Sequence, residues 1–410
     1  MFPCRLDEAG RLSLLSESPL TMARARNAIT KIGVEARVLA LSERRGVAQY
    51  LYRLIAELLD ISDREEYHLI VDQDINPINV INHPRFIVQR VPACKGYRFN
   101  TWLQLRLPAH ILRARYDLVF YSYNVLPLLH PSKSIVAIHD VKIQNSRGSF
   151  LGRQYADGGK YLPGALRSAQ RLIFVSEFTR REAEKDLGLL ANAAVIHEGI
   201  AEIYERLEFT QSDVASLKKK FGIRDRFVMA FGASTKHKNI DFLVRSFLRV
   251  RRQLPGAFQL LLVGCQEMDS SDYFRTLMAN HSEDGVVCVG FVSDTDVVAL
   301  YNCTDCFVYP SLYEGFGFPP LEAMACGAPV LASNVSAIPE IVGDAAQTFD
   351  PTDSATFDLS FIAFLSRLQN VEYRQALILK GYEHAKRYSW RTTAEKTLRV
   401  FHQVLGTSRS

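Results

Sequence analysis

Several features are absent from this sequence of 410 residues, and each absence argues against a class of protein. No apolar run approaches the length of about 18 residues that a membrane-spanning helix needs, so we expect no transmembrane segment. The first residues, MFPCRLDEAG, include early acids and lead into no apolar segment, so we expect no signal peptide. Charge of one sign is not in large excess, because the net charge of +5 is mild and does not by itself favour a nucleic-acid partner.

Cysteine is sparse, and its pattern argues against a disulfide framework. The seven cysteines are scattered and odd in number, which indicates a reduced, cytoplasmic chain. Cys303 and Cys306 form a C-x-x-C without a second pair, and the pattern around them predicts a helix end leading into a strand. We interpret these two cysteines as packing residues rather than as a zinc or redox site.

Short apolar runs alternate with amphipathic stretches along most of the chain. Runs of this length between helical stretches predict parallel sheets that are buried on both faces. The expected strands are 36–42, 67–73, 85–91, 116–122, 134–140, 171–177, 193–199, 226–232, 258–264, 285–292, 305–311 and 329–334. The expected helices include 46–59, 178–187, 240–252, 273–280 and 296–301.

The order of these runs predicts an α/β protein with two Rossmann-like, doubly wound parallel-sheet domains that face a cleft. We expect an N-terminal extension at 1–35, a first domain at 36–205 and a second domain at 206–388. The segment 200–216 contains no strand-like core and is the expected linker. Apolar residues recur at helical spacing in 389–410, which we expect to form a helix that crosses back to the first domain.

The segment 309–333, YPSLYEGFGFPPLEAMACGAPVLAS, carries the densest chemical signal. A loop with Glu314 follows an expected strand, and Pro319 and Pro320 suit the first turn of a helix. Free N–H groups at such a helix start bind a diphosphate well. Glu322, expected in the first turn, can accept hydrogen bonds from two neighbouring hydroxyl groups, as on a ribose. Taken singly, each glutamate is better explained as a loop charge or as a balance to the helix dipole.

Taken together, the residues EGFGFPPLEAMACGAPV, with Pro339–Glu340 beyond them, resemble the E-x7-E signature of retaining GT-B glycosyltransferases of family 4, also called group 1. Further similar segments are 46–58, 137–140, 175–183, 231–247 and 290–311, whereas 1–35 and about 60–115 do not match. This resemblance implies a hexosyltransferase that acts with retention of configuration. It also implies that the donor is a nucleotide sugar, for which GDP-mannose is our first expectation, and that no other cofactor is needed.

The resemblance assigns a cationic partner to the donor diphosphate, whose charge must be neutralised. Lys238 aligns with the family lysine that binds the phosphates. Many relatives carry an arginine shortly before it, where this chain has Ala233 and His237, so we expect Lys236 to substitute. A solvated turn is the alternative interpretation of Lys-His-Lys at 236–238.

The remaining site residues are also assigned by resemblance. Glu314, His139 and Asp140 are the expected catalytic group, and His139 and Asp140 follow a strand end, although such a pair also commonly caps the next segment. The donor-binding residues beyond the two lysines are Gly46, Val292, Gly315, Phe316, Gly317 and Glu322. Gly46 can equally be an ordinary turn glycine, and Val292, next to Phe291, can equally be core rather than a nucleobase contact.

Asp294 and Asp296 form a D-x-D, a pattern that can indicate a metal site. Ser293 precedes them at an expected helix start, so we interpret them as a capping pattern and expect no metal site.

The segment 90–116 carries six arginines or lysines, no acid, and the interleaved aromatics Tyr97, Phe99 and Trp102. This composition suits an anionic membrane that presents a lipid-linked acceptor, and a nucleic-acid surface or a solvated helix face are the alternatives. We therefore expect a cytoplasmic enzyme, with peripheral contact at the inner face of the cell membrane, that binds a saccharide or lipid-linked acceptor and no nucleic acid. The rival functions are an inactive nucleotide-sugar-binding subunit, or another GT-B enzyme such as an epimerase or a phosphorylase.

Overall fold

The computed structural model describes residues 4–6, 12–14, 29–41, 46–93, 101–141, 158–232, 235–265 and 285–406. The expected helix at 273–280, the residues Tyr97, Arg98 and Phe99, and the position of Ala233 lie outside the described residues.

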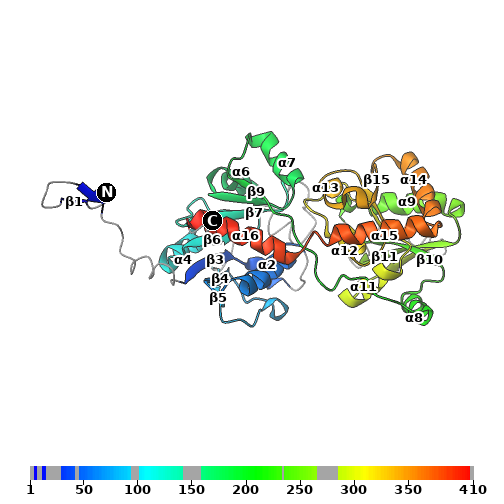
Figure 1. The fold of residues 1–410 in the computed structure, drawn as a ribbon, viewed down its shortest axis with the longest axis horizontal. Helices are drawn as coiled ribbons and strands as arrows, with labels where there is room; N and C mark the ends of the chain where they lie inside the picture. The colour runs from blue at the N-terminus through cyan, green and yellow to red at the C-terminus, as the bar shows by residue number, and fades with distance from the viewer. Residues whose placement is uncertain are drawn as a thin grey trace.

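Two parallel sheets form the cores of two domains (Figure 1). The first sheet has seven strands in the order β5-β4-β3-β6-β7-β8-β9, and the second has six in the order β12-β11-β10-β13-β14-β15. The expected α/β architecture of two Rossmann-like domains is confirmed. The strands of the first sheet are β3 (Thr30–Glu35), β4 (Glu65–Val71), β5 (Phe86–Arg90), β6 (Leu118–Tyr121), β7 (Lys133–Ile138), β8 (Arg171–Phe174) and β9 (Ala193–Val195). Those of the second are β10 (Arg226–Phe231), β11 (Phe258–Val263), β12 (Val286–Val289), β13 (Cys306–Tyr309), β14 (Val330–Ser333) and β15 (Gln347–Phe349). A separate antiparallel pair joins β1 (Cys4–Leu6) to β2 (Leu12–Leu14).

Helices pack around both sheets. The first domain carries η1 (Arg37–Ala40), α2 (Val47–Ile61), η2 (Pro77–Asn79), η3 (Trp102–Arg106), α4 (Leu107–Ala114), α6 (Gly158–Ser168) and α7 (Glu177–Leu187). The second carries α8 (Gln211–Phe221), η4 (Lys236–Lys238), α9 (Ile240–Val250), η5 (Arg251–Gln253), α11 (Asp294–Cys303), α12 (Phe318–Ala325), α13 (Ile338–Val342), η7 (Gly343–Ala345), α14 (Ser354–Arg367) and α15 (Val371–Ala385).

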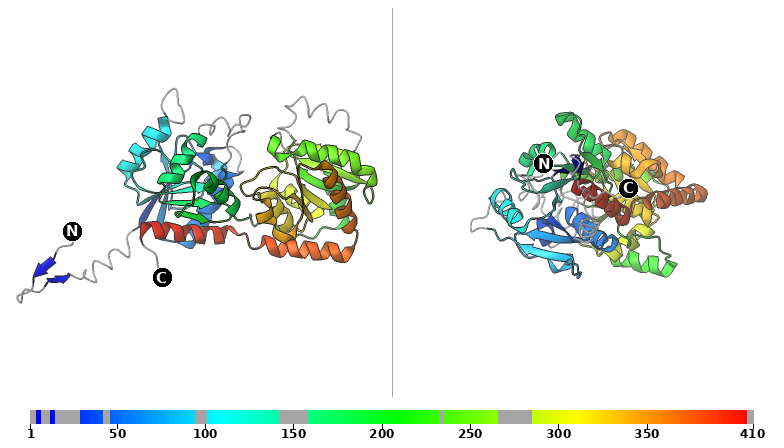
Figure 2. Two further views of the ribbon diagram at one scale, coloured as in Figure 1. Left: turned by 90° about the horizontal axis from the view of Figure 1, so that it is seen from above. Right: turned by 60° about the vertical axis from the view of Figure 1, so that its left-hand side comes forward.

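The C-terminal helix α16 (Trp390–Leu405) returns to the first domain, as expected. Figure 2 shows α15 and α16 following one another beneath the two domains. Trp390 and Phe401 of α16 are buried in the core of the first domain. The Lys133 ammonium at the start of β7 donates a hydrogen bond to the Leu405 carbonyl at the end of α16, at 3.1 Å. The helix therefore ties the far end of the chain to the seven-stranded sheet.

The two chain crossings between the domains lie side by side. The Ile200 N–H donates to the Tyr388 carbonyl at 3.1 Å. A Cβ atom on Gly199 would lie 2.2 Å from the Trp390 nitrogen, so only glycine permits this approach. The crossings thus form one connection between the domains.

One predicted strand is wrong. Residues 36–42 do not form a strand, because the short helix η1 lies there and the central strand β3 precedes it. Part of the expected N-terminal extension, residues 30–35, therefore belongs to the sheet. The signal of β3 was weak because only Ile32 and Val34 are apolar and buried within it, whereas Gly33 lies against the Tyr116 ring, where a Cβ would approach to 2.8 Å.

Candidate functional site

The charged centre of the site lies beside two neighbouring strands of the second sheet. Lys238 ends η4, which follows β10, and Glu314 lies in the loop after β13, which pairs with β10. The Lys238 Nζ lies 2.7 Å from Glu314 Oε1 and 3.4 Å from Tyr309 Oη. Burial acts to raise the pKa of Glu314, but the Lys238 ammonium and hydrogen bonds to the carboxylate outweigh burial and lower it. The side chain of Lys238 remains 30% exposed, so its ammonium can also meet an anion.

The loop from Gly315 leads into α12 through a left-handed glycine. Gly317 has φ of 104° and precedes α12, and Pro319 and Pro320 fall in the first turn as predicted. Because proline has no N–H, these two positions remove donors that a helix start usually offers. Backbone donors for a diphosphate must therefore come mainly from residues 315–318.

Glu322 lies deeper than predicted. It is the fifth residue of α12, just past the expected first turn, and only 6% exposed. The Tyr301 hydroxyl lies 3.4 Å from its carboxylate. Burial raises the pKa of Glu322 to about 8, against the opposing hydrogen bonds from Tyr204 and Tyr301. A pKa of about 8 favours the protonated form of Glu322 at neutral pH.

His139 lies at the carboxyl end of β7, in the first domain. Its Nδ1 lies 3.1 Å from Glu198 Oε1, and its Nε2 lies 3.0 Å from the Ser122 carbonyl. Both ring nitrogens therefore face oxygen atoms of the first domain. The ring also packs edge-on against Tyr50 of α2, with centroids 4.6 Å apart. His139 is thus fixed in one orientation.

The two domains meet where His139 and Asp140 face Gly315. A Cβ atom on Gly315 would lie 1.7 Å from the His139 carbonyl oxygen and 3.5 Å from the Asp140 Cβ. Burial raises the pKa of Asp140, His139 opposes this shift, and Glu314 adds to it. The structure therefore brings the three expected catalytic residues to one place, from two domains.

Other expected donor-binding residues lie in different surroundings. Lys236 is exposed at the start of η4, and Val292 is buried in the core of the second domain. The ring of Phe316 is buried against Phe318 and Tyr388, which leaves its backbone to face a donor. Gly46 precedes α2 with φ of 54°, and a Cβ there would meet nothing within 4 Å, so its backbone conformation alone calls for glycine.

The D-x-D residues act as a helix start, as interpreted. Ser293 accepts a hydrogen bond from the Asp296 N–H, and the Asp296 carboxylate lies 2.7 Å from Lys220 Nζ. Within the described ranges, no group of three or more His, Cys, Asp or Glu side chains is arranged to hold a metal ion. Burial raises the pKa of both Cys303, to about 11, and Cys306, which are free thiols, in keeping with a packing role.

Several polar residues at this site escaped the sequence analysis. Asn124 accepts from the His139 N–H and donates to the Asp140 carbonyl, both at 2.9 Å. Glu198 holds the His139 ring. Their common signal is position, since each closely follows the carboxyl end of a strand of the first sheet, β6 or β9.

One of the three aromatics expected at the basic surface, Trp102, lies in the core, whereas Tyr97 and Phe99 lie outside the described residues. Trp102 is buried, and its Nε1 donates to the Val91 carbonyl at 2.7 Å, because an indole placed in a core needs an acceptor. Exposed leucines lie in and near the described part of this segment, with exposed fractions from 63% to 75%: Leu105, Leu112, Leu128 and Leu129. In the part of the chain that the structure describes, no helix is long and apolar enough to span a membrane.

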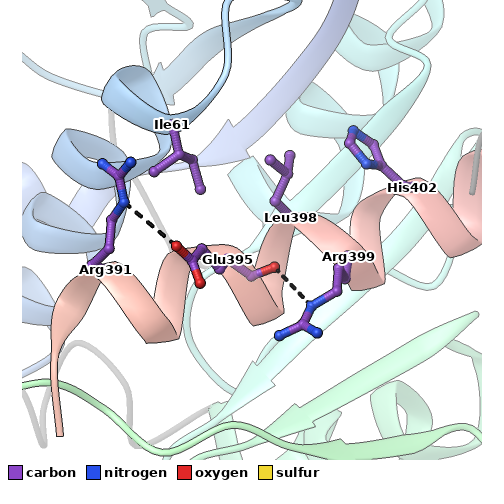
Figure 3. Close-up of a pocket in the computed structure, with 6 residues that line it drawn as sticks. All are labelled: Ile61, Arg391, Glu395, Leu398, Arg399 and His402. Carbon is purple, nitrogen blue, oxygen red and sulfur yellow. Dashed lines mark hydrogen bonds and ion pairs between the residues drawn. The ribbon is translucent and has the colours of Figure 1, made fainter. Parts of the chain in front are cut away.

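A shallow hollow of about 370 Å³ lies between the end of α2 and α16 (Figure 3). Arg391 pairs there with Asp60 and Glu395, and Arg399 donates to the backbone carbonyl of Glu395. Ile61 lies at the opposite end of α2 from Gly46, on the order of 20 Å away along a helix of that length. The hollow is therefore separate from the site described above.

The two domains meet beside the Lys238–Glu314 pair, and comparison with known families identifies the class of protein. The model of the group 1 glycosyl transferases matches residues 213–384, and that of glycosyltransferase family 4 matches residues 44–202. Together these matches span most of the chain. The chain belongs to the group 1, family 4 glycosyltransferases.

Individual relatives agree with this family. The chain is 26% identical over 370 residues to the O-antigen chain mannosyltransferase B of Escherichia coli, covering 87% of this chain and 95% of that relative. Sucrose-phosphate synthase of Thermosynechococcus elongatus has a similar fold, with a TM-score of 0.70, 20% identity and coverage of 92% of this chain and 100% of that structure. HepE of Anabaena in complex with UDP has a TM-score of 0.69 at 17% identity, with coverage of 92% and 100%. These likenesses confirm the GT-B fold.

Proposed function

We propose that this glycosyltransferase transfers a hexose from a nucleotide sugar, mannose from GDP-mannose as first choice, to a saccharide or lipid-linked saccharide. The observation that carries the proposal is the half-buried Lys238–Glu314 pair, which lies at the domain interface beside His139 and near a buried Glu322. The name of the Escherichia coli relative supports mannose and a role in cell-surface polysaccharide assembly. The UDP complex of HepE supports a nucleotide-bound donor.

The donor would lie along the second domain. The Lys238 ammonium and the N–H groups of residues 315–318 would bind the diphosphate, and the exposed Lys236 would supply a second cation. Glu322 would accept hydrogen bonds from the ribose, and the backbone near Val292 would face the nucleobase. Gly46, at the start of α2, would face the phosphates or the acceptor from the first domain.

We infer that transfer retains the anomeric configuration. The acceptor hydroxyl would attack the anomeric carbon on the face of the leaving group as the bond from that carbon to the phosphate oxygen breaks. The departing phosphate would take the hydroxyl proton. Glu314, kept ionised by Lys238, would stabilise the positive charge that the sugar acquires, with His139 and Asp140 facing it from the first domain.

One screen tests this proposal. Purified protein is incubated with a panel of nucleotide sugars and saccharide acceptors, and the anomeric configuration of each product is read by NMR. Transfer from GDP-mannose with retention is the expected result. Binding of a nucleotide sugar with neither transfer nor hydrolysis would overturn the proposal and indicate an inactive binding subunit, and epimerised donor would indicate a sugar epimerase.

We further propose that the first domain contacts an anionic membrane that carries the acceptor. Arg106 and Arg113 are exposed on η3 and α4 beside Leu105 and Leu112. The Gln104 side chain accepts a hydrogen bond from the Leu128 N–H at 2.8 Å, which brings the loop after β6 to the same surface. Apolar side chains flanked by arginines match the interface of an anionic bilayer. Leu128 follows Asn124 of the site by four residues, a reach of at most about 14 Å.

A further inference from the structure

The carboxylate of Glu340 crosses the domain interface. Glu340 lies in α13 of the second domain, yet its hydrogen-bond partners among the described residues belong to the first domain. One oxygen accepts from the Glu177 N–H at 2.8 Å, and the other accepts from the Phe178 N–H at 2.9 Å. His197 Nε2 lies 2.7 Å from the first oxygen. A helix start in one domain is thus bound by an acid from the other.

The same helix start holds the donor loop. Ser176 precedes α7, and its hydroxyl donates to the Gly315 carbonyl at 2.6 Å. The Thr179 hydroxyl donates to the same carbonyl at 3.2 Å. Both residues are fully buried. The start of α7 is therefore fixed to the second domain at two points, the Glu340 carboxylate and the Gly315 backbone next to Glu314.

The chemistry of the Glu340 contact favours this arrangement. The first N–H groups of a helix have no partner within the helix and carry partial positive charge, so a carboxylate satisfies them well. Burial acts to raise the pKa of Glu340, but the hydrogen bonds from His197, Glu177 and Phe178 outweigh it and lower the pKa. The acid is therefore ionised and bound. His197 is itself fixed, because its carbonyl accepts from the Thr393 hydroxyl of α16 at 2.8 Å.

We propose that Glu340 is a positioning residue that holds the two domains closed and thereby places Gly315 and Glu314 against His139. Without the Glu340 carboxylate, the start of α7 loses its hydrogen bonds to α13. It is then held to the second domain only by the Ser176 and Thr179 hydroxyl groups at the Gly315 carbonyl. The donor contacts proposed for Lys238 and Glu322 lie within the second domain and do not need closure. This inference rests on the proposed transfer reaction.

The experiment compares Glu340→Gln with Glu383→Gln, an exposed acid of the second domain that pairs with Lys386 of its own helix end. The amide of Glu340→Gln offers one acceptor where two N–H groups need acceptors. We expect kcat to fall about ten- to a hundredfold, as for loss of a hydrogen bond to a charged group. The affinity for the free nucleoside diphosphate and the Tm should stay near those of the control.

A second readout does not depend on activity. Small-angle X-ray scattering of the protein saturated with GDP should show a larger radius of gyration for Glu340→Gln than for Glu383→Gln. An unchanged radius and an unchanged kcat would overturn the inference, as would a fall in Tm that explains the whole loss of activity. If no nucleotide sugar is turned over by any variant but the radius still changes, the proposed reaction fails and the closing role of Glu340 stands.

Discussion

The two halves of the site are built differently. In the second domain, Glu314, the glycine loop and Glu322 come from one continuous stretch that the structure spans with a single loop and α12. In the first domain, His139, Asn124 and Glu198 come from the ends of three different strands and meet only in the folded sheet. Site residues in one continuous segment form a motif whose spacing can be recognised in the sequence. Site residues at the ends of separate strands appear in the sequence only as isolated residues. The half in the second domain, which we expect to bind the donor and call the donor half, could therefore be found by pattern. The half in the first domain, which we expect to face the acceptor, could be found only in part.

The largest effect is expected from a substitution at Gly315, where the two halves of the site are in contact. We expect Gly315→Ala to reduce kcat/KM on the order of a hundredfold or more, because misplacement of a reacting group by an ångström has effects of that size. The cause is steric, since a Cβ would lie 1.7 Å from the His139 carbonyl oxygen. Steady-state kinetics measure the loss, and calorimetry should show that GDP still binds.

Gly164→Ala is the matched control for that change, because a Cβ there meets nothing within 4 Å. Equal activity of the two alanine variants would show that activity does not depend on the close contact between Gly315 and the His139 carbonyl.

Within the donor half, substitutions of the two glutamates should affect different steps of the reaction. Glu322→Gln should weaken binding of the free nucleotide diphosphate about ten- to a hundredfold, the effect of one charge-assisted hydrogen bond. Glu314→Gln should leave that binding nearly unchanged and lower kcat, because its contact strengthens as the sugar gains positive charge. Titration of GDP into each variant decides between them. The reverse pattern would exchange the two roles, and no effect in either variant would place the site elsewhere.

The raised pKa of Glu322 predicts how pH changes binding. Ribose hydroxyl groups donate best to the carboxylate, so binding should release the proton that Glu322 carries below its pKa of about 8. Nucleotide affinity should therefore rise by up to about tenfold per pH unit towards pH 8 and then level off. Calorimetry in buffers of different ionisation enthalpy measures the released proton. Glu322→Gln should bind independently of pH in this range, and an equal slope in the variant would contradict the assignment.

The raised pKa of Glu322 also makes the stability of the protein depend on pH. The folded pKa of Glu322 is raised from 4.5 to about 8, so its neutral form favours the folded state. The free energy of unfolding should fall as pH rises from 4.5 to about 8. Glu322→Gln should lose that part of the decline.

The membrane contact proposed above involves the first domain. Reversal of Arg98, Arg106 and Arg113 to Glu should weaken binding to phosphatidylserine vesicles by at least about a hundredfold. Each basic residue near an anionic surface contributes about 1 kcal/mol, and the three new negative charges add repulsion. Binding of GDP should be spared. Vesicle co-sedimentation measures the change.

Three exposed basic residues of the second domain serve as the control for those reversals, namely Lys219, Arg224 and Arg252. Absence of vesicle binding by the unmodified protein, or an equal loss in both triple variants, would disprove the membrane contact.

The smallest effect is expected from chelation. Asp294 and Asp296 lie in the first turn of α11, and Asp296 forms an ion pair with Lys220. Lys238 and the backbone of the glycine loop are therefore the expected counter-charges of the diphosphate. Activity should survive EDTA with little change in rate. Loss of activity that manganese or magnesium restores would show that a metal ion takes part in the donor half.

Local pattern also explains which elements were predicted well. Runs such as those of β11 and β13 are buried over their whole length, so an apolar run marks them directly. The central strand β3 was missed because its buried positions include Gly33, which only the nearby Tyr116 ring explains, and Glu35, which pairs with Arg37. Trp102 was assigned to the surface by its basic neighbours, although its indole lies in the core.

The sequence alone determined the alternation of strands and helices, the family, the crossing-back helix and the donor loop, because each is encoded by residues close together in the chain. The tertiary structure decided which carboxylates are charged. The Lys238 ammonium lowers the pKa of Glu314, whereas burial raises the pKa of Glu322 to about 8. The tertiary structure also decided the contacts between domains, where Glu340 binds a helix start 162 positions away. Burial and long-range pairing depend on which segments meet, and no local pattern of residues specifies that.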